Sequence, residues 1–266
     1  MRKTIFFLLL SLAVVLTLLF LTVSTIHHED HLSYHPVTAD NCDITTDLDA
    51  VEDLSVTPNL IAQFYHYYSA HHDDLTYLPE FSAENKRPDW DALSLYVFLK
   101  ADLDENTAKE SLFTKEKFQE TLQKYMLPVD YTDGPSRYLT YENGIYTANG
   151  FDLPGAEYYR LTALTRDEQG VYTAVFDILH FEETEPFEPE TSPNMRSLLA
   201  YDDAILHVSE NGASLNMPKF NQAIEAIFLQ EDYASIFDLA GKVTIRFTLT
   251  DDTERPFYYL ACSRSK

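Results

Sequence analysis

Glycine is scarce in this chain, with seven glycines among 266 residues. Loops that cradle phosphate groups on backbone amides depend on closely spaced glycines, and the sequence contains no phosphate-binding loop or dinucleotide fingerprint. It also lacks a Gly-x-Ser-x-Gly nucleophile motif and a His-Glu-x-x-His zinc motif. We therefore expect no cofactor and no motif-defined hydrolase, although a catalytic site assembled from distant residues stays open.

Basic residues are also few. The chain has 19 lysines and arginines against 43 aspartates and glutamates, which gives a formal net charge of −24. A field of this sign repels nucleic-acid phosphates, so we expect no nucleic acid partner. The acidic charge could serve to attract a cationic partner. Alternatively, it forms a solvated surface that binds no partner.

Cysteine is limited to Cys42 and Cys262, which excludes a disulfide-rich scaffold and a four-cysteine zinc site. Cys42 lies near the start of the region expected to fold, and Cys262 lies near its end. In an oxidising compartment a disulfide between them would tie these two ends together. The alternative is two unpaired cysteines buried as small apolar residues.

A long uncharged stretch, residues 4–26, follows Arg2 and Lys3 at the N-terminus. A helix of about 20 apolar residues crosses a bilayer, whereas a cleaved secretory signal has a shorter apolar core and a small-residue cleavage site. We therefore expect residues 1–26 to be an uncleaved signal-anchor, rather than a cleaved signal or a buried core helix. Because cations stay on the cytoplasmic side, the rest of this single-pass cell-membrane protein is expected to be extracellular.

The remaining chain divides in two. Residues 27–56 are polar and acidic and predict a juxtamembrane linker, and residues 57–266 predict an extracytoplasmic domain. Apolar residues recur at helical spacing early in the domain and alternate later. The expected helices are 58–71, 90–102, 114–125 and 219–229, and the expected strands are 137–142, 145–148, 158–167, 171–181, 204–209, 241–250 and 255–263. Residues 182–195 predict a loop.

Helices followed by antiparallel hairpins indicate an α+β fold. Asn143-Gly144 between two alternating segments predicts a tight hairpin, and Glu168-Gln169-Gly170 predicts another. A curved antiparallel sheet wrapped around three helices resembles the cone-shaped, nuclear-transport-factor-like architecture. This resemblance concerns architecture, and no residue motif connects the chain to that family.

His27, His28 and His31 are the best-spaced metal-ligand candidates, since they lie three and four residues apart. They could share an ion if the membrane helix continued beyond the lipid, or bind zinc or copper loosely from an unstructured tract. The alternative is a hydrated tether. The stretch FYHYYSAHHDD, residues 64–74, is histidine-rich as well, but its spacings of five and six do not fit one face of an α-helix. It therefore predicts the polar end of a helix.

Asp177 and His180 are the candidate catalytic residues. Asp177 alternates with Val175 and Leu179, so all three lie on one face of the expected strand. A carboxylate among apolar neighbours is a candidate acid or base if it is buried. His180 lies nearby but on the opposite face. The alternative is that Asp177 points into solvent or pairs with an arginine.

The chain has 18 tyrosines and 17 phenylalanines, which serve core packing as well as ligand binding. Our first functional hypothesis is a non-catalytic domain that binds a peptide, an envelope polymer or a partner protein in a sheet-lined concavity. The second is an extracellular hydrolase or metal-dependent enzyme that uses Asp177, His180 or the clustered histidines. The third is a structural role beside a membrane complex. A tyrosine-lined groove favours binding, whereas converging His, Asp and Arg side chains favour an enzyme.

Overall fold

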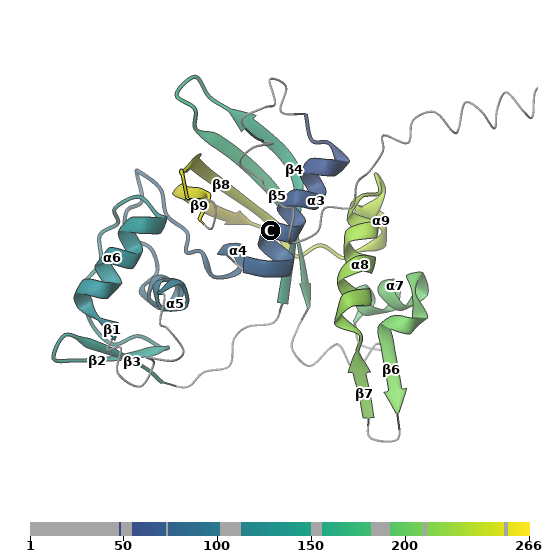
Figure 1. Ribbon diagram of the computed structural model, residues 1–266, viewed down its shortest axis with the longest axis horizontal. Coiled ribbons are helices and arrows are strands. Elements are labelled where there is room, and N and C mark those ends of the chain that lie inside the picture. The colour runs from purple at the N-terminus through teal and green to yellow at the C-terminus, as the bar shows by residue number, and fades with distance from the viewer. Residues whose placement is uncertain are drawn as a thin grey trace, which may run out of the picture. The chain divides into compact units, whose positions relative to one another are not determined.

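The computed structural model describes a mixture of helices and antiparallel sheets, as the α+β pattern predicts (Figure 1). None of the helices in the described part of the chain is long and apolar enough to cross a membrane. The expected anchor, residues 1–26, lies outside this part, as do Cys42 and most of the expected linker. The described residues are 48, 55–72, 74–101, 113–149, 156–181, 192–209, 212–252 and 255–266.

Three antiparallel sheets organise these residues, with strand orders β4-β5-β8-β9, β1-β3-β2 and β6-β7. In chain order the elements are α3 (Pro58–Tyr65), η2 (His66–His72), α4 (Asp74–Tyr77), α5 (Trp90–Lys100), β1 (Phe113–Thr114), α6 (Lys115–Tyr125), β2 (Leu139–Glu142), β3 (Ile145–Ala148), β4 (Ala156–Arg166), β5 (Tyr172–Phe181), α7 (Pro193–Tyr201), η4 (Asp203–Ile205), β6 (Leu206–Ser209), β7 (Gly212–Leu215), α8 (Met217–Phe228), α9 (Tyr233–Ile236), β8 (Gly241–Leu249) and β9 (Phe257–Ser265).

Side-chain caps place the three early helices where the sequence predicts them. Thr57 caps α3 by accepting a hydrogen bond from the amide of Leu60 at 3.2 Å. Asp89 caps α5 in the same way, with 3.0 Å between its carboxylate and the amide of Ala92. Thr114 does so for α6. The segment Trp90–Lys100 is therefore helical, as predicted.

The four-stranded sheet has an apolar cluster on each face. On one face α3 packs against β5, with the rings of Phe64 and Phe176 5.4 Å apart in an edge-to-face contact. On the other face α7, α8 and α9 cover the end of β5 that carries Leu179 and Phe181, and Phe181 lies 5.2 Å from Phe220 of α8. Because β5 is covered on both faces at this end, its polar residues there lie beside the core.

The connection between β5 and β8 was not predicted. These strands pair directly, with Asp177 opposite Lys242 and Phe176 opposite Val243, although residues 182–240 separate them in sequence. The described residues of this intervening segment contain the β6-β7 hairpin, the helices α7, α8 and α9, and the short 3-10 helix η4. Of these, α7 begins at Pro193, inside the expected loop, because Ser192 caps it through the amide of Met195.

Leu48 shows that the core extends into the range predicted as a linker. Its side chain is fully buried in the cluster under α3. The Tyr172 hydroxyl, on β5, lies 3.5 Å from the carbonyl oxygen of Leu48 and donates toward it. This contact ties the segment before α3 to the central sheet.

Candidate binding site

Asp177 is buried, and both of its carboxylate oxygens are occupied. The Tyr233 hydroxyl of α9 donates to Oδ2 at 2.6 Å, and the ammonium of Lys242 on β8 donates to Oδ1. The side chain of Asp177 is 6% exposed, whereas that of Lys242 is 54% exposed. The carboxylate is therefore held from the core side by a phenol and from the solvent side by a cation.

Arg160 completes what we call the Asp177 cluster: Arg160, Asp177, Tyr233 and Lys242. Its guanidinium lies 3.7 Å from the centroid of the Tyr233 ring, and its Nε donates to the carbonyl oxygen of Phe228 at 2.6 Å. Burial lowers the pKa of Arg160, while burial and the Asp177 carboxylate raise the pKa of Tyr233 to about 12. These contacts fasten the end of α8 and the start of α9 onto the sheet.

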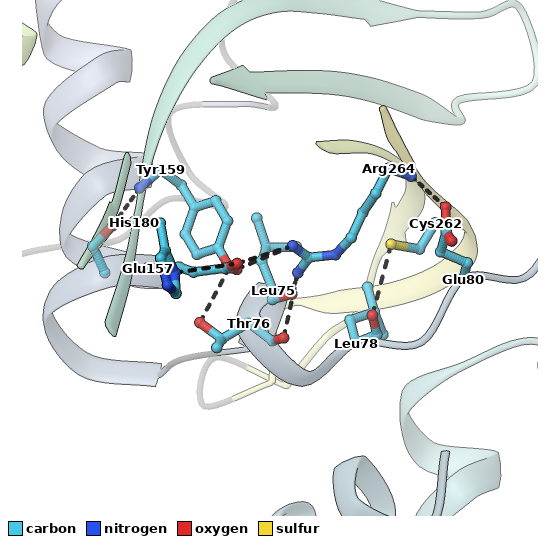
Figure 2. Close-up of polar contacts among 10 residues, drawn as sticks. Leu75, Thr76, Leu78, Glu80, Glu157, Tyr159, His180, Cys262 and Arg264 are labelled. Atoms are coloured by element: carbon cyan, nitrogen blue, oxygen red, sulfur yellow. Dashed lines mark hydrogen bonds and ion pairs between the residues drawn. The ribbon is translucent and has the colours of Figure 1, made fainter. Parts of the chain in front are cut away.

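His180 belongs to a different cluster, which Figure 2 shows. It lies on the opposite face of the sheet from Asp177, as alternation along β5 requires. Its Nδ1 lies 3.9 Å from Oε1 of Glu157. The same carboxylate accepts hydrogen bonds from the Tyr159 hydroxyl and from Nη1 of Arg264, the latter at 3.0 Å. The structure therefore does not bring Asp177 and His180 together.

Arg264 is the central cation of this Glu157 cluster, which we define as Thr76, Glu157, Tyr159, His180 and Arg264. Besides Glu157, its guanidinium reaches the carbonyl oxygens of Leu75 and Thr76 in α4, the second at 3.3 Å (Figure 2). Burial and the charge of Glu157 raise the pKa of Tyr159 well above its ordinary value. The cluster thus joins β4, β9 and α4, and its polar groups form hydrogen bonds and ion pairs with one another.

Cys262 lies in the core of β9, with 2% of its surface exposed. Its Sγ is 3.9 Å from the carbonyl oxygen of Leu78, and burial raises the pKa of the thiol to about 12. Such a thiol does not supply a nucleophilic thiolate near neutral pH. Because Cys42 is outside the described residues, the Cys42–Cys262 disulfide stays a prediction.

Within the histidine-rich stretch, His66–His72 form a π-helix, η2, where the sequence predicts that the α-helix continues to residue 71. Within it, Nε2 of His66 lies 3.2 Å from Oε1 of Glu225 on α8, so this imidazole joins two helices. No group of three or more histidine, cysteine or acidic residues in the described part of the chain is placed to hold a metal ion. His27, His28 and His31 lie outside that part.

A cavity of about 330 Å³ lies where the start of α5 meets the segment that follows α6. Ligand sites typically span roughly 300–1,000 Å³, so this volume suits a small ligand or one unit of a polymer. The lining residues come from two stretches about 40 positions apart in sequence, and we call this space the aromatic cavity. They are Arg87, Pro88, Trp90, Asp130, Tyr131 and Thr132.

Two stacked rings form the apolar wall of the aromatic cavity. The rings of Trp90 and Tyr131 are nearly parallel, with an interplanar angle of 5° and centroids 5.7 Å apart. The indole N–H of Trp90 donates to the carbonyl oxygen of Pro135 at 3.1 Å. Phe118 supports the ring of Tyr131 from α6, with centroids 5.2 Å apart. The wall is therefore fixed in place by the surrounding structure.

Asp133 anchors the segment that carries Tyr131. It accepts a hydrogen bond from the Tyr146 hydroxyl of β3 at 2.7 Å and another from the ammonium of Lys115. Burial acts to raise the pKa of Asp133, but these two donors outweigh it and hold the pKa below its usual value. In addition, the amide of Asp130 donates to the carbonyl oxygen of Lys86 at 2.7 Å. This last bond joins the two stretches that line the aromatic cavity.

Arg87 and Asp130 supply opposite charges to the aromatic cavity. Both side chains are exposed, and neither forms a hydrogen bond or ion pair with another residue that the structure describes. The described lining includes one carboxylate and one guanidinium, but no histidine or cysteine. It therefore offers a donor and an acceptor beside an aromatic wall, an arrangement suited to holding a ligand.

Trp90 begins an expected helix and was not predicted to be a site residue. Its signal was weak: one tryptophan in the chain, two residues after a proline and three after an arginine. Comparison with known proteins adds no further information, because no family model, curated protein or solved structure matches the chain. The function must therefore be argued from the residues themselves.

Proposed function

We propose that the protein is a membrane-anchored binding protein that holds an extracellular ligand in the aromatic cavity and does not catalyse a reaction on it. In this proposal residues 1–26 span the cell membrane once, with the N-terminus in the cytoplasm. The observation that carries the proposal is the aromatic cavity, with its fixed Trp90–Tyr131 wall and with the Arg87 and Asp130 side chains, which have no partner in the described part of the chain.

The state of the candidate catalytic residues supports binding over hydrolysis. A general acid or base must face its substrate. Both oxygens of Asp177 are already bound by Tyr233 and Lys242, and His180 faces Glu157 on the other side of the sheet. Neither lines the aromatic cavity. The side chains of His180, Glu157 and Arg264 do converge, but Glu157 and Arg264 are engaged by each other, by Tyr159 and by α4, which supports a role in the fold.

We keep the cone-like architecture as part of this proposal. The packing of α3 against one face of the four-stranded sheet supports it. The ligand site proposed here, however, lies beside α5, and not on the four-stranded sheet as first expected for a sheet-lined concavity.

Photocrosslinking on intact cells tests the proposal with the full-length chain. A benzophenone amino acid replaces Thr132 at the aromatic cavity and, in a matched control, Tyr201, which is 52% exposed on α7. We expect an adduct from position 132 that disappears when Tyr131→Ala is added, and no such adduct from position 201. Equal labelling from both positions, or no adduct from position 132, contradicts the cavity as the binding site.

Protease protection tests the membrane part of the proposal. A reporter fused after Lys266 should be digested by protease added to intact cells, and the full-length chain should remain in the membrane fraction. A reporter that is protected from the protease contradicts the extracellular orientation. A shortened product released into the medium contradicts the uncleaved anchor.

A further inference from the structure

The chemistry of the aromatic cavity restricts its ligand further, and this step rests on the proposed function. Trp90 and Tyr131 provide an apolar wall of two parallel rings, and aromatic side chains offer contact area at low conformational entropy. A ligand that uses this wall needs an apolar face of its own. The apolar wall alone would suit a sugar ring, a proline ring or an aliphatic chain.

The polar groups narrow this choice. Arg87 can only donate hydrogen bonds and ionised Asp130 can only accept them, whereas Thr132 can do both. A ligand matched to all three must carry donors and acceptors close to its apolar face. Hydroxyl groups meet this requirement because each one donates and accepts. An aliphatic chain would leave all three polar groups without partners.

The charges indicate a neutral ligand. The lining carries one positive and one negative side chain, and the whole chain has a formal charge of −24. An anionic ligand would be attracted by Arg87 but repelled by Asp130 and by the surrounding field. A cationic ligand would be attracted by Asp130 and by the surrounding field but repelled by Arg87 at close range. A neutral ligand forms charge-assisted hydrogen bonds with both side chains and faces neither repulsion.

We infer that the aromatic cavity binds a neutral, hydroxyl-rich sugar unit of an extracellular glycan. One face of the sugar ring packs on the wall formed by Trp90 and Tyr131. Its hydroxyl groups donate to Asp130 and accept from Arg87. Because Pro135, Asp133 and Phe118 hold the wall in position before binding, little ordering is required when the sugar enters.

A proline-rich peptide is the main competitor, since extended proline segments also dock on aromatic rings. Proline has a carbonyl acceptor but no backbone N–H. It could accept from Arg87, but it has no donor to offer the Asp130 carboxylate, which would lose water without gaining a partner. The presence of Asp130 beside the wall therefore favours the sugar.

Trp90 makes the inference directly measurable because it is the single tryptophan of the chain. All tryptophan fluorescence comes from the wall of the aromatic cavity. We would reconstitute the full-length chain in liposomes and titrate it with chitotetraose, cellotetraose and maltotetraose. For one or more of these sugars we expect a saturable change in emission with a Kd of roughly 0.1–1 mM.

Variants separate the ring contact from the polar contacts. Tyr131→Ala should weaken sugar binding at least about 10-fold, whereas Tyr131→Phe should bind as the wild type does. Asp130→Asn and Arg87→Gln should each weaken it about 5-fold, because one charge-assisted hydrogen bond becomes a neutral one. Tyr201→Ala and Arg196→Gln, both exposed on α7, are the matched controls and should have no effect. Circular dichroism of each variant verifies that it has folded.

Two results would overturn the inference. The first is a flat titration with all three sugars, and the second is sugar binding that Tyr131→Ala leaves intact in a folded protein. A saturable response to decaproline without a response to sugars would identify a peptide site. In that case the position-132 adduct on cells would still form and the proposed binding function would stand. Loss of that adduct instead defeats the binding function itself.

Discussion

The charged side chains of this protein lie in two contrasting settings. In the Asp177 and Glu157 clusters each carboxylate is bound by a phenol and a cation. At the aromatic cavity, Arg87 and Asp130 both contribute to the lining and have no side-chain partner among the described residues. The polar side chains of the two sheet clusters therefore maintain the fold, whereas Arg87 and Asp130, which the sequence did not single out, are available to a ligand.

The largest stability effect is expected at Arg264. Arg264→Met keeps much of the side-chain volume but leaves Glu157 and two carbonyl oxygens of α4 without their donor. Because both charges are largely but not fully buried, we expect the free energy of unfolding to fall by about 2–3 kcal/mol. Urea denaturation measures this change. Arg196→Met, on an exposed position, is the control. Equal midpoints for the two variants would contradict the structural role of the Glu157 cluster.

A slightly smaller effect is expected at Asp177. Asp177→Ala removes the acceptor of the buried Tyr233 hydroxyl and the partner of Lys242. We expect a loss of about 2 kcal/mol in the free energy of unfolding, compared with almost none for the exposed Glu120→Ala, which removes the same charge. If Asp177 is instead a catalytic group, its removal will abolish an activity while leaving the unfolding midpoint in place.

Tyr233→Phe should have a modest effect near neutral pH and a distinctive effect in alkali. Folding raises the pKa of Tyr233 to about 12, from about 10 in an unfolded chain. The folded state therefore retains this proton longer, so the associated stability is full below about pH 10 and is lost as the pH rises through 12. Between about pH 8 and 11, the free energy of unfolding should decline less steeply with pH in Tyr233→Phe than in the wild type. Parallel pH profiles would show that Tyr233 does not contribute.

The smallest stability effect is expected at the aromatic cavity. Arg87→Gln and Asp130→Asn remove charges that are exposed and unpaired among the described residues, so each should change the free energy of unfolding by less than about 0.5 kcal/mol. The same two substitutions are expected to weaken sugar binding. A loss of several kcal/mol at either position would place that side chain with the fold-maintaining clusters and remove the contrast between the two settings.

Local signals account for the parts of the fold that the sequence predicts correctly. Caps at Thr57, Asp89 and Thr114 locate α3, α5 and α6, and Asn143-Gly144 locates the turn between β2 and β3. These features depend on residues within a few positions of one another. The four-residue helices α4 and α9 carry too few residues to show a periodic pattern, and α7 begins within a proline-containing acidic segment that predicts a loop. The π-helical turn at η2 departs from α-helical spacing.

The site depends on contacts that sequence spacing does not reveal. Trp90 and Tyr131 meet because α5, α6 and the small sheet pack together, and Glu157 meets Arg264 across 107 positions. Alternation along β5 did predict that Asp177 and His180 face opposite ways. It could not show that Tyr233 of α9 and Lys242 of β8 would engage Asp177, or that Glu157 of β4 would lie beside His180.

The strand order β4-β5-β8-β9 has a consequence for how the domain assembles. Each outer pair is a local hairpin with a short loop, but pairing β5 with β8 requires residues 182–240 to be looped out. Closing so long a loop carries an entropic cost that short hairpins avoid, and non-local pairing slows folding. We therefore expect the two hairpins to form early and to join late. The barrier to folding should then depend on the few residues at their seam, such as Phe176 and Val243.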